Sequence, residues 1–242
     1  MTVVEVIRAL APIDAKSLRR DPLLRWLIFY PLLLAVVIRW GAPVLRIHLI
    51  TRFNFDLQPY YPLLMSFVAL LTPMLAGTVI GFLLLDQRDD QTLTALQVTP
   101  LTLSGYFAYR IAVPTALSFA ITILIFPITG LLELGSLALA GVAVSSCLLA
   151  PLYALFLGAF ANNKVQGFAL SKALGVLLVP PLIAYFVKSP WQLLFGLDPL
   201  YWPAKFLWSV NSANRAWTYL LAGMLFHCVL LKLLMLGWKI RV

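Results

Sequence analysis

The sequence predicts an all-α integral membrane protein, a single domain over residues 1–242 with six transmembrane helices. Of the 242 residues, 62% are hydrophobic and 11% are charged, whereas a soluble domain has about a quarter charged residues. Three charge-free stretches, residues 57–85, 111–132 and 134–163, each exceed the roughly 20 residues needed to cross a bilayer. Further apolar runs are bounded by Lys or Arg residues, whose long side chains can reach the headgroups from inside a span.

The six spans and their orientation follow from these runs and from the basic residues between them. The predicted spans are residues 23–45, 60–85, 105–130, 134–161, 166–187 and 216–238. With both termini in the cytoplasm, twelve of the 18 Lys and Arg residues fall in cytoplasmic segments, as the positive-inside rule favours. This topology explains the net charge of +9 without a nucleic-acid partner, because no basic stripe with interleaved aromatic residues is present.

Residues 1–20 form a separate element before the first span. Val3, Val6, Ile7 and Leu10 fall on one face of a helix, and basic residues follow, which predicts an interfacial helix on the cytoplasmic leaflet. The alternative is a frayed tail, since the periodic run is short. Asp21 with Pro22 after it would cap the first span.

The segment 188–215, before the last span, is too apolar for a free loop and is crowded with Trp and Tyr. Asp198 followed by Pro199 offers a helix start. We therefore expect an outer re-entrant helical hairpin of one or two short, half-buried helices. Irregular backbone at that depth persists only where protein or a water-lined cavity covers it.

Between the second and third spans lies the most polar stretch of the chain, residues 86–101. Asp89 or Asp90 can cap a short helix, Leu93 and Leu96 would share one face of it, and Pro100 would end it after about two turns. The sequence thus predicts a brief cytoplasmic helix that displays acids and threonines across the ends of two spans. The alternative is a solvated loop whose acids only cap a helix.

This stretch, with the interfacial helix and six spans around it, resembles the type-2 ATP-binding-cassette permeases, particularly bacterial drug or antibiotic exporters. The chain departs from that pattern at Gln91, where glycine is common, and at Thr94, where an acid is common. The likeness lies in Asp86, Arg88, Asp89, Asp90, Thr92, Leu93, Ala95, Leu96, Thr99 and Pro100. All of these except Ala95 are predicted partner-coupling residues, and residues 86–101 are called the coupling segment below.

The resemblance implies a transport subunit rather than an enzyme. It implies export of an amphipathic or hydrophobic substrate across a bacterial inner membrane, by two identical or related permease chains with two nucleotide-binding ATPase subunits beneath them. ATP and Mg would be bound by those subunits, and this chain would need no cofactor. In agreement, the sequence contains no Gly-Lys pair and so no phosphate-binding loop.

Two other functions remain open on the sequence alone. An ion-coupled secondary transporter or channel usually carries ionisable residues in mid-membrane, and the sequence offers almost none. A lipid-modifying enzyme would need clustered acids, histidines or metal ligands. His48 and His227 have no ligand partner at useful spacing, so we expect no catalytic residue and no metal site.

Gly77 and Gly81 form a GxxxG spacing in the second span, which lets two helix backbones approach closely. The pattern does not decide between packing within one chain and packing across a dimer. The substrate-binding residues are not identifiable from the sequence.

Overall fold

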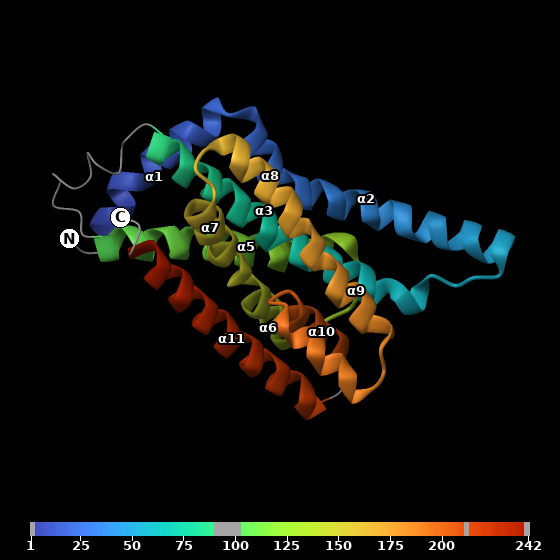
Figure 1. Cartoon of the computed structure of the whole chain (residues 1–242). Coiled ribbons are helices and arrows are strands. Elements are labelled where there is room, and N and C mark those ends of the chain that lie inside the picture. Colours follow the sequence, from blue (N-terminus) through green and yellow to red (C-terminus); the bar gives the residue numbers. More distant parts are fainter. Residues whose placement is uncertain (1–2, 90–102, 211–212, 240–242) are drawn as a thin grey trace.

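The structure, a computed structural model, describes residues 3–89, 103–210 and 213–239, and every regular element in these ranges is a helix (Figure 1). Six helical stretches are long and apolar enough to cross a membrane, which confirms the predicted number of spans. The elements are α1 Val3–Arg20, α2 Pro22–Phe53, η1 Gln58–Tyr60, α3 Tyr61–Asp89, α5 Leu103–Thr129, α6 Ser136–Cys147, α7 Leu149–Phe160, α8 Lys164–Leu174, η2 Gly175–Leu178, α9 Val179–Phe186, η3 Pro190–Leu197, α10 Tyr201–Ser209 and α11 Ala213–Lys239.

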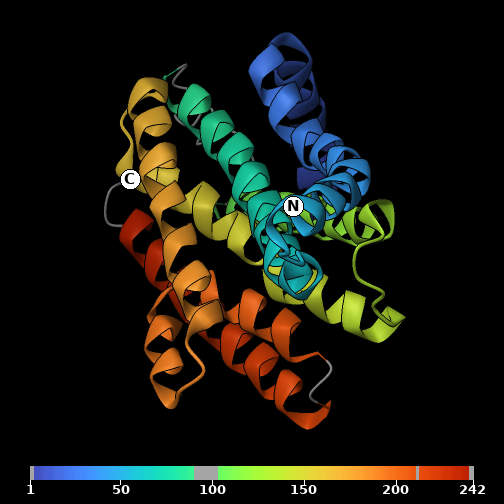
Figure 2. The same cartoon turned by 90° about the vertical axis from the view of Figure 1, so that its right-hand side faces the viewer.

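Helix α3 is the centre of the bundle. In its most apolar window 89% of the residues are buried, compared with 17% for α2 and 22% for α11. Helices α2, α5, α7 and α10 pack around it, and α2 and α11 lie on opposite outer sides (Figures 1 and 2). The outer helices therefore present apolar side chains to lipid, while α3 is enclosed by protein.

Helices α3 and α7 approach each other closely at the two glycines of α3. A Cβ atom on Gly77 would lie 2.3 Å from the carbonyl oxygen of Ala150, and one on Gly81 would lie 2.8 Å from Leu157. Both neighbours belong to α7, so in this structure the GxxxG spacing serves packing within one chain. The absent side chains let α3 and α7 approach backbone to backbone.

We expect Gly77→Ala to destabilise the protein by about 1–3 kcal/mol, because the new methyl group must push away a backbone carbonyl in a packed interior. The matched control is Gly41→Ala in the exposed α2, where an added Cβ meets nothing within 4 Å. That control should be neutral or stabilising by up to about 1 kcal/mol, since alanine favours helix. Thermal unfolding in detergent measures both, and equal melting temperatures would refute the contact.

Two of the spans are broken by proline. Pro151 has no N–H to donate to the Cys147 carbonyl, and the helix divides at Leu148 into α6 and α7. In the next span the adjacent Pro180 and Pro181 follow the 3-10 turn η2, which joins α8 to α9. Each break interrupts the regular α-helix without ending the span.

Helix α2 begins at the predicted cap and continues beyond the predicted span. The Asp21 carboxylate accepts hydrogen bonds from the N–H groups of Leu23 and Leu24, which confirms the expected cap. The helix continues past residue 45 to Phe53, and Asn54 closes it in the left-handed conformation with φ of 50°. No glycine or proline lies between residues 45 and 53 to stop it.

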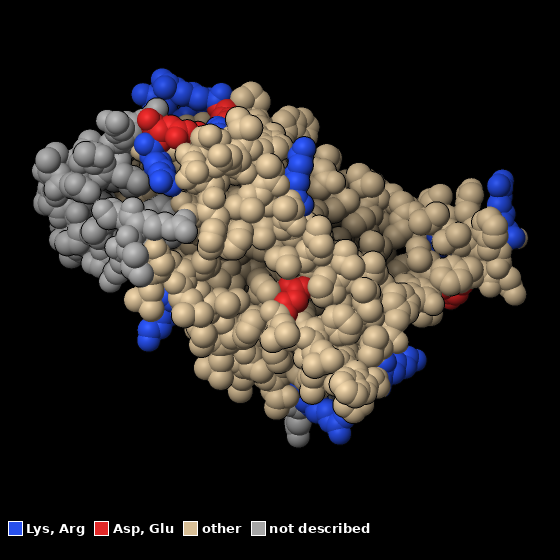
Figure 3. Space-filling view, viewed as in Figure 1, with Lys and Arg blue, Asp and Glu red and all other residues tan. Residues whose placement is uncertain are grey.

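Charged side chains gather toward the two ends of the molecule. On the face shown in Figure 3 the broad middle is uncharged apart from an acidic patch near its centre and a basic patch above it, and most of it is apolar, as expected for a surface in contact with lipid. Helix α1, the end of α3, the start of α5 and the end of α11 all lie at one end of the bundle (Figure 1). This end carries the candidate site described next.

The N-terminal segment is helical over Val3–Arg20, so the frayed-tail alternative is wrong for these residues. Its Leu10 is buried against Leu84, Tyr106 and Tyr109. Helix α1 thus packs on the ends of α3 and α5 and is held there as part of the fold.

Candidate coupling site

The predicted coupling residues begin on a helix end. Helix α3 continues through Asp86, Arg88 and Asp89, and α5 resumes at Leu103. Arg88 and Asp89 are exposed, and Asp86 is partly exposed. The other predicted coupling residues lie outside the described residues: Asp90, Thr92, Leu93, Leu96, Thr99 and Pro100.

Asp86 is tied to two other helices through one lysine. The Lys164 ammonium group, at the first residue of α8, donates to Asp86 at 3.0 Å and to Asp21 at 2.8 Å. The hydrogen bond from Lys164 lowers the pKa of Asp21 below its usual value. Arg88 makes a longer contact of 3.5 Å to the carbonyl of Ala161, just before α8. The entrance to the coupling segment is therefore linked to the start of α2 and the start of α8.

We expect Lys164→Met to cost less than about 1 kcal/mol of stability, because the Lys164 side chain is 32% exposed and water screens the pair. A carboxylate whose pKa is lowered on folding contributes stability above its ordinary pKa of 3.8 and loses it as the pH falls through the lowered value. The difference between wild type and variant should thus be constant from pH 8 to pH 5 and vanish in stronger acid. Unfolding measured across this pH range tests it, and a difference that grows on acidification would contradict the assignment.

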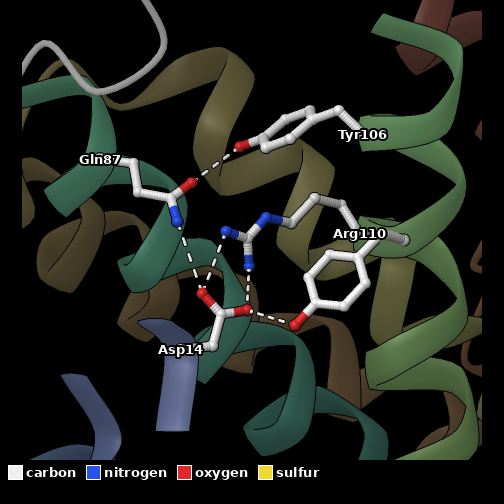
Figure 4. A network of polar contacts seen from close by, with 5 residues as sticks. Asp14, Gln87, Tyr106 and Arg110 are labelled. Atoms are coloured by element: carbon white, nitrogen blue, oxygen red, sulfur yellow. Dashed lines mark hydrogen bonds and ion pairs between the residues drawn. The ribbon is translucent and has the colours of Figure 1, made fainter. Parts of the chain in front are cut away.

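A second, buried polar network lies at the same end (Figure 4). The Arg110 guanidinium on α5 donates two hydrogen bonds, of 2.7 and 3.2 Å, to the carboxylate of Asp14 on α1. The Tyr109 hydroxyl donates to the same carboxylate at 2.9 Å. The Arg110 side chain is fully buried and lies over the rings of Tyr106 and Tyr109, 5.3 Å from each centroid.

This network also includes the helix that enters the coupling segment. The Gln87 side chain on α3 donates to Asp14 at 3.4 Å and accepts from the Tyr106 hydroxyl at 3.0 Å. Gln87 lies three residues before the segment's first residue outside the described range, and Tyr106 lies three residues into α5. Asp14, Gln87, Tyr106, Tyr109 and Arg110 are called the latch below.

The latch holds α1 to both helices that flank the coupling segment. Removing one partner of a buried ion pair leaves an uncompensated charge and costs about 3–5 kcal/mol, far more than the exposed pair at Lys164. The latch therefore makes a strong connection among α1, α3 and α5 at this end of the bundle.

The latch and Lys164 were not among the predicted site residues. Arg110 did carry a signal, since it lies inside a predicted span where an ionisable residue needs a partner. Asp14 carried none, because it is 96 residues from Arg110 and looks like an ordinary polar residue of an amphipathic helix.

Two further ionisable side chains are buried away from the latch. Asp198 lies in the turn between η3 and α10 and is only 8% exposed, and His227 on α11 is fully buried. His227 Nε2 and the carbonyl oxygen of Pro199 lie 2.8 Å apart, which joins the turn between η3 and α10, called the hairpin turn below, to the middle of α11. Within the described residues, no group of three or more His, Cys, Asp or Glu side chains could hold a metal ion.

Comparison with known proteins places the chain in a transport family. Residues 14–235 match the family described as Fluoroquinolones export permease protein Rv2686c-like. The chain is 36% identical over 226 residues to the fluoroquinolones export permease proteins MT2760 and Rv2686c of two Mycobacterium tuberculosis strains, CDC 1551 / Oshkosh and H37Rv, covering 91% of this chain and 90% of each relative. No solved structure matches it significantly. With six apolar helices and a family match over most of its length, the chain is a multi-pass membrane protein of the Rv2686c-like family of export permeases.

Proposed function

We propose that this chain is the permease subunit of an ATP-driven exporter and that a separate ATPase subunit pushes on its coupling segment. The single observation that carries the proposal is the latch, which joins both flanks of that segment to α1 and, through α3 and α5, to the spans. A loop that merely connected two spans would need no such buried junction.

In this account the chain itself performs no chemistry. Two permease chains, identical or homologous, surround the transport path, and two ATPase subunits bind ATP and Mg beneath them. Nucleotide binding favours one position of the coupling segments and thereby one packing of the spans, and hydrolysis resets it.

The orientation follows from the same account. The end that holds the latch faces the cytoplasm of a bacterial cell, with both termini on that side of the inner membrane. This places Lys164 and Arg110 on the side where basic residues are enriched.

The names of the relatives support a fluoroquinolone or another amphipathic drug as the cargo. The groove lined by Ala112, Thr115, Phe119 and Leu148 is open and apolar. An apolar groove of this kind suits a compound that partitions into lipid.

The test is reconstitution in proteoliposomes with the cognate ATPase. We expect stable co-purification of the two proteins and drug movement that requires both subunits and ATP. Drug movement by the permease alone, driven by an imposed ion gradient, would overturn the proposal and favour the secondary-transporter alternative.

A further inference from the structure

The latch does not account for a second set of buried polar groups, which lies where the hairpin turn meets α7 and α11. Asp198 contributes a carboxylate, His227 an imidazole and Tyr153 of α7 a phenol, and all three are more than nine-tenths buried. Each has one polar atom with no hydrogen-bond partner: Asp198 Oδ2, His227 Nδ1 and Tyr153 OH. Tyr153 belongs to the same buried cluster as Leu200, which lies two residues after Asp198, so α7 meets the turn before α10 here.

The depth of these groups is set by α11. His227 lies next to the midpoint of Ala213–Lys239, about 20 Å from either end at 1.5 Å per residue. The short contact between His227 and Pro199 holds the hairpin turn at the same level. A carboxylate at this depth would be among the most costly groups in the chain unless something pairs with it.

The protein itself supplies only part of that pairing. Asp198 Oδ1 accepts from the Leu200 N–H at 3.0 Å, and no cation of the described chain lies within ion-pair distance of Oδ2. Lys205 of the same hairpin donates to Gln192 and lies over the Tyr219 ring, 5.1 Å from its centroid. It is therefore engaged elsewhere.

The unpartnered atoms are mainly acceptors. When His227 Nε2–H donates to the Pro199 carbonyl, Nδ1 carries no hydrogen and can only accept. A single proton would satisfy Asp198 Oδ2 and leave Nδ1 unpaired. An ammonium group has two or three N–H donors and one positive charge, so one N–H can pair with Oδ2 and the charge can neutralise the carboxylate, while another donor remains for an acceptor such as Nδ1.

We propose that Asp198 and His227 form a buried binding site for the protonated amine of the exported compound, with Tyr153 beside it. This inference rests on the proposed export function and names the chemical group that the permease selects. The hairpin turn places the acid in the membrane interior, where only a cargo that brings its own hydrogen-bond donors and charge can pair with it.

The test compares a fluoroquinolone that has a free piperazine amine with the same compound N-acetylated on that amine, which cannot take a proton. For transport by the complex with its ATPase, the KM of the free amine should be about 10- to 100-fold lower than the KM of the acetylated compound. This factor corresponds to the free energy of a hydrogen bond to a charged group. In Asp198→Asn, which keeps the acceptor for the Leu200 N–H, the KM ratio should fall to near one. Asp56→Asn, in the exposed outer pair with Arg46, should keep the wild-type ratio.

Three results would overturn the inference. The first two are no preference for the free amine in wild type and an unchanged KM ratio in Asp198→Asn. The third is that Asp198→Asn reduces transport of both compounds equally and flattens the pH dependence of transport, which is the result expected if Asp198 binds a proton and not the amine. Equilibrium binding to the purified permease, followed through the compound's own fluorescence, separates this inference from the proposed function. If ATP never drives transport but the free amine binds more tightly than its acetylated form and Asp198→Asn removes that preference, the site stands while the exporter proposal fails.

Discussion

Arg110→Met is expected to destabilise the permease by about 3–5 kcal/mol, because the Asp14 carboxylate would remain buried without its ion pair. Tyr109 and Gln87 would still donate to it, but neither brings a positive charge. Thermal unfolding and limited proteolysis of the N-terminal helix should both report the loss. A single variant as stable as wild type would contradict the buried position of the pair.

A double replacement distinguishes the contribution of the latch to stability from its contribution to coupling between the ATPase and the spans. Exchanging both charges for apolar residues of similar size, as in Asp14→Leu with Arg110→Met, is often neutral for stability. We expect this double variant to recover folding and to bind the ATPase, while drug-stimulated ATP turnover falls because α1 is no longer locked to the flanks of the coupling segment. Full stimulation in the double variant would assign the latch to folding alone.

The other large effect is expected in the coupling segment itself. Alanine at Asp89, Asp90 or Thr92 should reduce transport about 5- to 150-fold, the usual range of a coupling free energy of 1–3 kcal/mol, while ATP hydrolysis continues. The spans should stay folded, since Asp89 is exposed. Drug flux and phosphate release measured on the same proteoliposomes give the number of drug molecules moved per ATP hydrolysed.

The matched control for these variants is Gln91→Ala, because Gln91 lies in the same segment at a position that departs from the exporter pattern. It should couple nearly as well as wild type. Normal transport per ATP in all three test variants would remove these residues from the proposed site.

The number of spans was predictable because a bilayer demands long apolar helices, and such runs are visible in composition alone. The start of α2 was predictable for a local reason, since Asp21 and Pro22 satisfy the first backbone groups of the helix. The end of α2 was not, because the predicted span stops before the charged Arg46, and a charged residue ends an apolar run without ending a helix. Whether Gly77 packs against a helix of its own chain or of a second chain could be decided only from the position of α7.

The polar contacts were beyond the sequence because they join residues far apart along the chain. Asp14 finds Arg110 only after α1 folds back on α5, and Lys164 meets Asp21 across 143 residues. Asp198 was recognised as a helix-start residue, and its Oδ1 does accept from Leu200 just before α10. Its burial near His227 depends on how η3 and α10 pack against α11, which local patterns do not determine.

The most direct measurement of the central claim is chemical labelling of the coupling segment. In a variant lacking Cys147 and Cys228, a single cysteine at Gln91→Cys should react with an impermeant thiol reagent only in inverted membrane vesicles, and the bound ATPase subunit should protect it. Reaction of this cysteine from the outer side of the membrane, or equal reaction with and without the ATPase, would contradict the claim that the ATPase acts on the permease through this segment.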